Sequence, residues 1–363
     1  MNDAADLTAR HEYPITISRR AALLGGAAGL ALAGVGGTPL GALARQAATP
    51  DANARATWDE IDANLAATAP NTVLLTAELI DGEPVEIHAV DADRVMPIGS
   101  SFKFYVLGAL SMQIEEGILD WEQMVAIVDE HKSVPGGDLR YVPNGTEFTL
   151  RYLAERMMQK SDNTATDALI YLVGREKVEE ALGIMGHHDP SLNIPLFTTR
   201  EFAFMKLVVP PDQLKTYFAS SVEERRQFLT DVVAKLSYEE LIAAADKQTG
   251  PINLFGLEWF ATRNDLANAV AYLWAQSQKE GLRPVAEVIA LETQLTFNGE
   301  IWPYVGFKGG SELGMLSGTW LMQRADGRMF IYSIGFADET APLDMGPVIA
   351  VMEQVRDQLA VTP

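Results

Sequence analysis

The sequence predicts an α+β fold of three layers, α-β-α, in which one antiparallel sheet built from both chain ends is flanked by helices and joined to an all-helical lobe. Two observations support this prediction. Strand-like runs occur early, in "TVLLTAELIDGEPVEIHAV", and return late, in "GMLSGTWLMQRADGRMFIYSIGFA". The segment between them is mostly helical in pattern, so the two groups of strands are expected to meet in a single sheet.

The first elements follow from local patterns. Residues 57–67 have the spacing of a helix, and Asp81-Gly82 between two β-rich runs predicts a hairpin turn. The stretch "PIGSSFKFYVLGAL" then begins a helix that is expected to end at Gly117, because glycine is favoured directly after a helix.

The later elements complete the lobe and the sheet. The charged segment 221–247 predicts one or two surface helices. Strands return in "EIWPYVGFKGG", and a turn at Ala325-Asp326-Gly327 and a closing helix from Gly346 to Leu359 follow. One domain, residues 45–363, thus has a mixed α/β part, at about 55–118 and 284–363, and a helical lobe, at about 119–283.

Composition excludes several classes of partner. The chain has 363 residues, of which 48% are hydrophobic and 21% charged, as in ordinary soluble globular proteins. Its formal net charge of -21 would repel nucleic acid and anionic membranes. We therefore expect a monomer that acts on a small molecule.

The N-terminus has the pattern of an export signal, residues 1–44. Arg19 and Arg20 precede an uncharged stretch that ends in Ala42-Leu43-Ala44, a small-residue cleavage pattern. Twin arginines point to the pathway that exports folded proteins, so we expect a periplasmic or secreted protein. A permanent membrane anchor is the alternative, but the glycines and Pro39 make the segment only weakly apolar.

The chain has no cysteine, which excludes disulfides, thiolate nucleophiles and cysteine metal sites. Among its five histidines the only cluster is His187-His188-Asp189. Adjacent loop positions rarely converge on one ion, so we interpret this cluster as a solvated turn. No metal and no cofactor are expected.

The serine and lysine of "PIGSSFKFYVLGAL" form the first candidate site. Side chains three residues apart on a helix are neighbours, so Ser100 and Lys103 can touch, whereas Ser101 and Lys103 face different ways. A lysine in this apolar helix is desolvated, which lowers its pKa and lets it act as a base toward the serine. The alternative is that Ser100 only caps the helix and Lys103 extends to solvent.

Two further motifs carry candidate residues. In "MMQKSDNTATDALI", Ser161 offers a hydroxyl for proton relay and Asn163 an amide that can hold a substrate carbonyl. In "GFKGGSE", Lys308 supplies a positive charge while Gly309-Gly310 let a ligand approach closely. Taken singly, these motifs can be an ordinary helix start and a strand bulge.

The order SxxK, SDN and KxG, on a helix, a lobe and a strand, is a strong joint signal. With "SDNTATDALI", it resembles the penicillin-recognising serine enzymes, in particular the class A β-lactamase family, over nearly all of the mature chain. This resemblance implies a β-lactamase/transpeptidase-like fold. It also implies that Ser100 is the nucleophile and Lys103 its base, and that Ser161, assisted by Lys308, passes a proton to the leaving group.

The resemblance further implies that Asn163, Gly309, Gly310 and Ser311 bind substrate, with the amides of Ser100 and Ser311 forming the oxyanion hole. Gly309 stands where the family has a hydroxyl-bearing residue, which removes one hydrogen bond to a substrate carboxylate. Ser311 is a candidate to replace that bond.

A larger departure concerns deacylation. In class A enzymes a glutamate in an ExxxN pattern activates the deacylating water, and the matching region, residues 190–207, lacks that pattern. Glu201 is the only acid there after Asp189. A capping box with Thr198 explains Glu201 better than a role as general base.

Four functions therefore stay open. A β-lactam hydrolase is expected first, and an esterase or amidase using the same serine comes second, since "TTRE" and "FKGGSE" are shared with a branch containing the cephalosporin esterase of clavulanic acid clusters. The others are a β-lactam-binding protein with negligible deacylation and a cell-wall D,D-peptidase.

Overall fold

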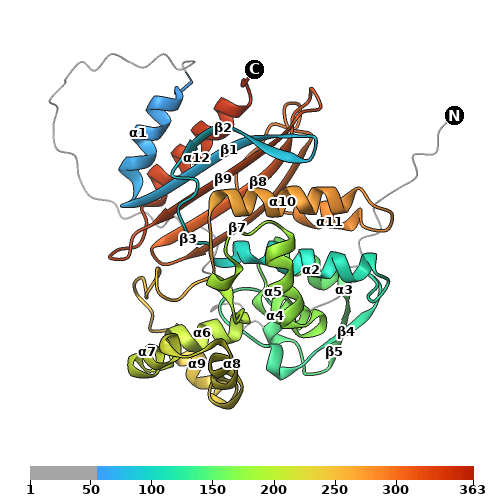
Figure 1. Ribbon diagram of the computed structural model, residues 1–363, viewed down its shortest axis with the longest axis vertical. Coiled ribbons are helices and arrows are strands. Elements are labelled where there is room, and N and C mark those ends of the chain that lie inside the picture. The colour runs from blue at the N-terminus through green and yellow to red at the C-terminus, as the bar shows by residue number, and fades with distance from the viewer. Residues whose placement is uncertain (1–54) are drawn as a thin grey trace, which may run out of the picture. The chain divides into compact units, whose positions relative to one another are not determined.

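The computed structural model describes residues 55–363, so the expected export signal lies outside the described residues. A five-stranded antiparallel sheet has the order β2-β1-β9-β8-β7, which joins strands from both ends of the chain as the sequence predicts (Figure 1). Its strands are β1 (Asn71–Ile80), β2 (Glu83–Val90), β7 (Tyr304–Glu312), β8 (Met315–Gln323) and β9 (Met329–Ala337).

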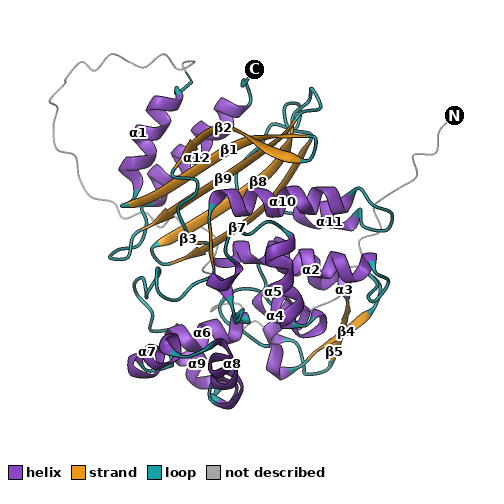
Figure 2. Cartoon of the chain, in the orientation of Figure 1, coloured by secondary structure: helices purple, strands orange, loops and turns teal. Residues whose placement is uncertain are grey.

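Helices cover both faces of this sheet (Figure 2). On one face lie α1 (Trp58–Thr68) and α12 (Met345–Leu359), which pack on each other and on β1 and β9. Their apolar side chains share a core with Trp320, Tyr332 and Phe336 of the sheet. On the other face lies α10 (Arg263–Ser277), which contacts β1, β8 and β9, so the expected three layers are present.

Local chemistry accounts for the two expected features near the start. Thr57 accepts a hydrogen bond from the Glu60 amide, and Glu60 in turn accepts from the Thr57 amide, so a capping box begins α1. Asp81 and Gly82 have φ of 52° and 90°, the left-handed conformation that a two-residue hairpin requires.

The rest of the chain forms the lobe, which begins at the C-terminal end of α2 (Lys103–Glu115). Its helices before residue 190 are α3 (Leu150–Gln159), α4 (Asn163–Val173) and α5 (Arg175–Ile184), and α11 (Pro284–Ile289) packs beside α3 and α10. Two small sheets, which the sequence did not predict, pair β4 (Met124–Ile127) with β5 (Thr146–Thr149) and β3 (Met96–Pro97) with β6 (Phe260–Ala261).

Between residues 190 and 262 the chain makes an excursion of four helices. They are α6 (Thr199–Leu207), α7 (Pro211–Ala219), α8 (Val222–Asp231) and α9 (Tyr238–Ala245). The last two are the surface helices predicted in the charged segment. In Figure 1 all four helices of this excursion lie together at one end of the lobe, away from the sheet. Within residues 55–363, no helix combines the length and hydropathy that a membrane span needs.

Candidate active site

The two adjacent serines lie on a single 3-10 turn, Gly99–Phe102, that leads directly into α2. Ser101 is fully buried, and its hydroxyl donates to Ser317 Oγ on β8 at 3.3 Å. Ser100 is partly exposed, and its hydroxyl takes part in none of the hydrogen bonds among the described residues. Of the two serines, Ser100 is thus the one whose hydroxyl is accessible and has no hydrogen-bond partner within residues 55–363.

Lys103 is buried completely, and its ammonium donates three hydrogen bonds within the described chain. They go to Ser161 O at 2.7 Å, Asn163 Oδ1 at 2.8 Å and Ser161 Oγ at 3.0 Å. None goes to Ser100, although the two residues stand three apart, because the acceptors of the 161–163 turn use all three protons of Lys103. Lys103 would have to release one of these hydrogen bonds before it could accept the proton of the Ser100 hydroxyl.

Ser161 joins the two lysines of the site. Its Oγ accepts from Lys103 Nζ at 3.0 Å and from Lys308 Nζ at 3.1 Å, which leaves its own proton to donate elsewhere. Its φ of 51° is uncommon for a residue with a side chain, and such conformations persist only where neighbouring contacts hold them. Here Asp162 caps α4 and also accepts from the Asp138 and Leu139 amides.

Lys308 reaches the site from β7. Its side chain is almost fully buried, and besides Ser161 it donates to Gly309 O at 2.6 Å. The structure thus brings Ser100, Lys103, Ser161, Asn163 and Lys308 to a single place where α2, the head of α4 and β7 meet.

Burial sets the electrostatics of this cluster. It is the main cause that holds the pKa of Lys103 well below its usual value, and the positive charge of Lys308 lowers that pKa further. Asp162 and Asp167 act in the opposite direction but more weakly. Burial likewise lowers the pKa of Lys308 to about 7. Lys308 can therefore exchange protons near neutral pH, and Lys103 gives up its proton more readily than an ordinary lysine, which suits proton transfer to and from a reacting group.

Glycines let the serine turn and β7 approach each other. A Cβ at Gly310 would overlap the Ile98 carbonyl oxygen and the Ser100 amide nitrogen, and one at Gly99 would lie 3.3 Å from the Ser311 amide nitrogen. The amides of Ser100 and Ser311 are thus close neighbours on facing segments, as an oxyanion hole requires.

Gly309 has its own reason for lacking a side chain. A Cβ there would lie 2.7 Å from Cζ of Phe307 and 3.0 Å from the Ser317 carbonyl oxygen. The Phe307 ring packs at 4.7 Å on Trp320 between the sheet and its helices, so it has little room to give way. A hydroxyl-bearing residue at position 309 would require that ring to move.

The structure has the capping box that the sequence predicts for Glu201. Thr198 Oγ1 accepts from the Glu201 amide, and Glu201 Oε2 accepts from the Thr198 amide at 2.9 Å. Arg175 also donates to both carboxylate oxygens, at 2.6 and 2.8 Å. The Glu201 carboxylate is thus fully engaged away from Lys103.

Sequence reasoning missed two residues that connect the site to α6. Asp167, buried in α4, accepts from the amides of Thr199 and Arg200 at 2.7 and 2.9 Å, and burial raises its pKa to about 7. Thr199 Oγ1 in turn donates to Asn163 O at 3.2 Å. Asp167 stands four residues after Asn163 in an apolar helix, and this spacing was the available signal.

A second missed group lies behind the serine turn. Glu258 is buried, and its Oε2 accepts from the Gly99 amide at 3.1 Å and from the Trp259 amide at 3.0 Å. Its other oxygen faces Lys206 of α6 at 3.4 Å, and Lys206 also pairs with Glu312 at the end of β7. No sequence pattern indicated this contact between distant segments.

His187 and His188 approach Asp265 so that one ligand atom of each lies within 4.8 Å of the others. The expected solvated turn is wrong for His187, which is buried because its Nε2 binds Phe260 O at 2.8 Å while its Nδ1 faces the Asp189 amide. Asp265 accepts from His188 twice and from the Thr262 amide, as part of the cap of α10. These hydrogen bonds already explain the arrangement.

The family model described as "Beta-lactamase enzyme family" matches residues 56–237, half of the chain. The chain belongs to this family. The match includes the serine turn, the 161–163 turn and α6, whereas β7 with Lys308 lies beyond it. No curated protein matches the sequence.

Solved structures support the same fold over most of the chain. A β-lactamase from Sphaerobacter thermophilus DSM 20745 is 18% identical with a TM-score of 0.59, and covers 84% of this chain and 97% of its own. A β-lactamase from Desulfarculus baarsii DSM 2075 is 16% identical with a TM-score of 0.56, at 83% and 98% coverage. A PBP-A variant in acyl-enzyme complex with penicillin G is 14% identical with a TM-score of 0.53, at 83% and 95% coverage. These likenesses establish the fold.

Proposed function

We propose that this member of the β-lactamase family is an exported serine hydrolase that opens β-lactam rings through an acyl-enzyme on Ser100. The observation that carries the proposal is the Ser161 hydroxyl, which accepts from two buried lysines, at 3.0 and 3.1 Å, beside a serine whose own hydroxyl is free within the described chain. If Ser100 only capped the helix and Lys103 only extended to solvent, there would be no reason for both lysine amines to be buried and to share Ser161 as a partner.

The acylation step follows from these contacts. Neutral Lys103 accepts the proton of Ser100 as Oγ bonds to the lactam carbonyl carbon. The oxyanion that develops receives hydrogen bonds from the Ser100 and Ser311 amides. The carbon–nitrogen bond then breaks, and the leaving nitrogen takes a proton from Ser161, which Lys103 or Lys308 replaces. Water later adds to the ester, which releases the opened product and restores Ser100.

Substrate binding uses the remaining motif residues. Asn163 donates its amide nitrogen to Pro135 O at 2.6 Å, which fixes the amide plane beside Lys103. Lys308 and the exposed Ser311 bind a substrate carboxylate, while Gly309 and Gly310 leave the strand edge open to the ring. With no side chain at position 309, Ser311 supplies the only hydroxyl on this stretch of β7.

A second function, β-lactam binding with very slow deacylation, is favoured by one specific observation. The hydrogen bonds of Lys103 in the described structure go to no carboxylate, and Glu201 is bound to Arg175 and Thr198. A site that can form the acyl-enzyme but has no carboxylate placed to activate water would leave the acyl group on the serine. The acyl-enzyme complex of the PBP-A variant gives a precedent in a structural neighbour.

Intact-mass measurement after mixing with penicillin G separates these functions. A hydrolase gives opened product without a lasting adduct, and a binding protein gives an adduct that persists for hours. Turnover of a p-nitrophenyl ester with neither adduct nor opened penicillin would favour the esterase or amidase. No mass change and no turnover of either substrate would exclude acylation chemistry at Ser100.

The export part of the proposal has a separate test. Arg19→Lys together with Arg20→Lys removes the twin arginines but keeps two positive charges. Fractionation of a host with twin-arginine export should then show the wild-type chain outside the cytoplasm and the double variant retained inside. An equal distribution of the two would contradict this route.

A further inference from the structure

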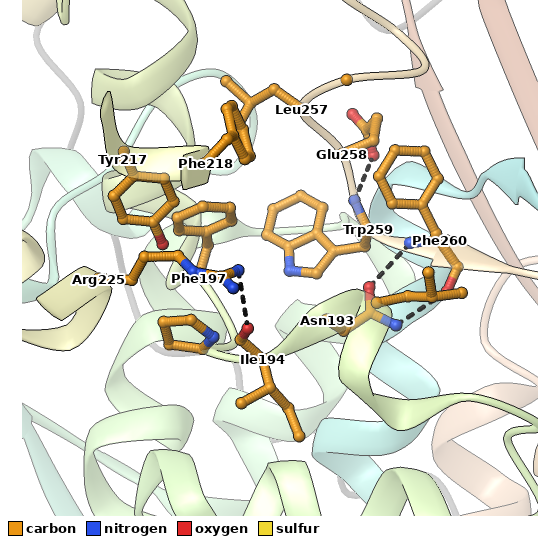
Figure 3. A pocket seen from close by; sticks show the side chains of 13 residues that line it. Asn193, Ile194, Phe197, Tyr217, Phe218, Arg225, Leu257, Glu258, Trp259 and Phe260 are labelled. Atoms are coloured by element: carbon orange, nitrogen blue, oxygen red, sulfur yellow. Dashed lines mark hydrogen bonds between the residues drawn. The ribbon is translucent and has the colours of Figure 1, made fainter. Parts of the chain in front are cut away.

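A pocket lies behind the serine turn, where the excursion of residues 190–262 folds back on itself (Figure 3). Its cavity is about 50 Å³, room for a few water molecules or a small polar group. Rings of Phe197, Phe218, Tyr217 and Trp259 form much of its lining, and Arg225 of α8 closes one side. The pocket is thus built by loops of the excursion together with α7 and α8, and by none of the motif residues.

Hydrogen-bond donors without partners face this pocket. The Trp259 side chain is 4% exposed and the Tyr217 side chain 3%, and neither the indole nitrogen nor the hydroxyl has a partner among the described residues. Buried polar groups are rarely left unpaired, because each lost hydrogen bond to water costs free energy. In Figure 3 both groups are turned toward the space beside the Arg225 guanidinium.

Arg225 adds a charge to these two donors. Its guanidinium donates to Ser220 O at 3.2 Å and to Ile194 O at 3.4 Å, so the backbone positions it. No carboxylate of residues 55–363 pairs with this guanidinium. A guanidinium can donate five hydrogen bonds, and these two contacts leave others for a ligand.

We propose that this pocket binds a small carboxylate. Two neutral donors and one guanidinium without a paired carboxylate suit a group that only accepts hydrogen bonds and carries a negative charge. The flat aromatic walls suit a short apolar remainder such as a methyl group. Water alone would supply no negative charge to the guanidinium.

The one acid that lines the pocket does not oppose this assignment. Glu258 directs its carboxyl group to the amides of Gly99 and Trp259 and to Lys206, and Figure 3 shows it on the far side of the Trp259 backbone from the three donors. Burial is the main cause that raises the pKa of Glu258 well above its usual range.

The position of the pocket links it to the reactive serine. Trp259 O accepts from the Ile98 amide at 2.9 Å, and the Trp259 ring stacks on Phe102 with centroids 4.0 Å apart. A ligand bound to the Trp259 indole therefore contacts a residue that itself contacts Ile98 and Phe102, the residues at the two ends of the serine turn.

The test is a titration of the ¹⁵N-labelled full-length protein with sodium acetate, followed at the Trp259 indole N–H resonance, which Trp259→Phe assigns. Acetamide serves as the uncharged probe of the same shape, and sodium chloride at equal ionic strength controls for salt. Acetate should shift the resonance saturably, and acetamide should bind at least about tenfold more weakly because it lacks the charge that meets Arg225. No shift, or equal shifts with acetamide or chloride, would overturn the proposal.

Variants test the donors one at a time. Tyr217→Phe removes only the unpartnered hydroxyl, and Arg225→Gln removes the charge; each should weaken acetate binding by about tenfold. Lys215→Gln, on the exposed side of α7, is the matched control and should leave binding unchanged. If Arg225→Gln fails to fold, Tyr217→Phe alone decides: unchanged acetate affinity in that variant counts against the site. None of these readouts depends on hydrolytic activity.

Discussion

Two parts of the site, which we call its walls, are built in different ways. On the acylation wall, made of the serine turn, the 161–163 turn and β7, the Lys103 and Lys308 amines both donate to the Ser161 hydroxyl, and Lys103 also donates to the Asn163 side chain. On the second wall, formed by α6, the loop before it and Asp167 of α4, the acidic groups already have hydrogen-bond partners. Glu201 is held by Arg175, and Asp167 is held by the amides at the start of α6.

Under the proposed function, this difference means that the two half-reactions place separate demands on one fold. Forming an acyl-enzyme needs a nucleophile, a proton route and an oxyanion hole, and the first wall holds groups suited to all three. Hydrolysis of the acyl-enzyme needs a base that activates water. On the second wall, the Glu201 carboxylate is instead part of a capping box and an ion pair. Experiments that remove groups from each wall in turn can break or sharpen this contrast.

The largest effect is expected at the serine turn. Ser100→Ala should reduce acylation by penicillin G at least about 10³-fold, because the attacking oxygen is removed. Ser101→Ala is the control: it loses only the 3.3 Å contact to Ser317 and should keep most of the activity. Intact mass after mixing reports both, and a labelled Ser100→Ala protein would rule out this residue as the nucleophile.

Removal of the buried base should come next. Lys103→Met keeps the length of the side chain but loses the amine, and acylation should slow by about 10²- to 10⁴-fold. Lys160→Gln, which changes an exposed lysine just before the 161–163 turn, should acylate as fast as the parent protein. Rapid-quench mass measurement gives both rates, and equal rates for the two variants would exclude Lys103 from the proton route.

The pH dependence should show that the two amines are coupled. Lys308, whose pKa is about 7, becomes charged as pH falls below that value, and protonation of Lys103 removes the base, so acylation should decline as pH falls. In Lys308→Met the neighbouring charge that lowers the pKa of Lys103 is gone. The acid limb should then move to higher pH, while the overall rate drops by about tenfold or more. Stopped-flow acylation between pH 5.5 and 9 measures the limb, and an unmoved limb would mean that the lysines titrate independently.

The smallest effect on chemistry is expected at Glu201. Glu201→Gln should lower the free energy of unfolding by about 1–3 kcal/mol, because a mostly buried ion pair with Arg175 is broken, while the deacylation rate stays the same. Denaturant unfolding and adduct decay measure the two quantities. Glu176→Gln, an exposed pair on α5, should change neither. Slower decay in Glu201→Gln would place a deacylating base on the second wall after all.

How far the sequence could predict this site depended on where its contacts lie in the chain. Thr198 with Glu201 is a local pair, so cap chemistry was sufficient to predict its hydrogen bonds. Helical spacing placed Ser100 and Lys103 near each other in the chain but did not predict which groups Lys103 binds. The sheet was predictable because runs rich in β-forming residues, bounded by turn signals such as Asp81-Gly82, mark strands even when their partners are distant.

Other features depend on contacts that no local pattern contains. Glu258 meets Gly99 across 159 positions, and Lys206 meets Glu312 across 106. Which groups accept hydrogen bonds from Lys103 likewise depends on how α2 packs against the 161–163 turn. The expected contact with Ser100 was therefore replaced by three hydrogen bonds to that turn.

The bare backbone of Gly310 also limits how this enzyme can diversify. Any side chain at that position would push β7 off the serine turn and separate the Ser100 and Ser311 amides. Its neighbour Ser311 is exposed and faces no such limit. Libraries aimed at new substrate preferences should therefore leave residue 310 untouched and place their variation at 311 and in the loop that follows.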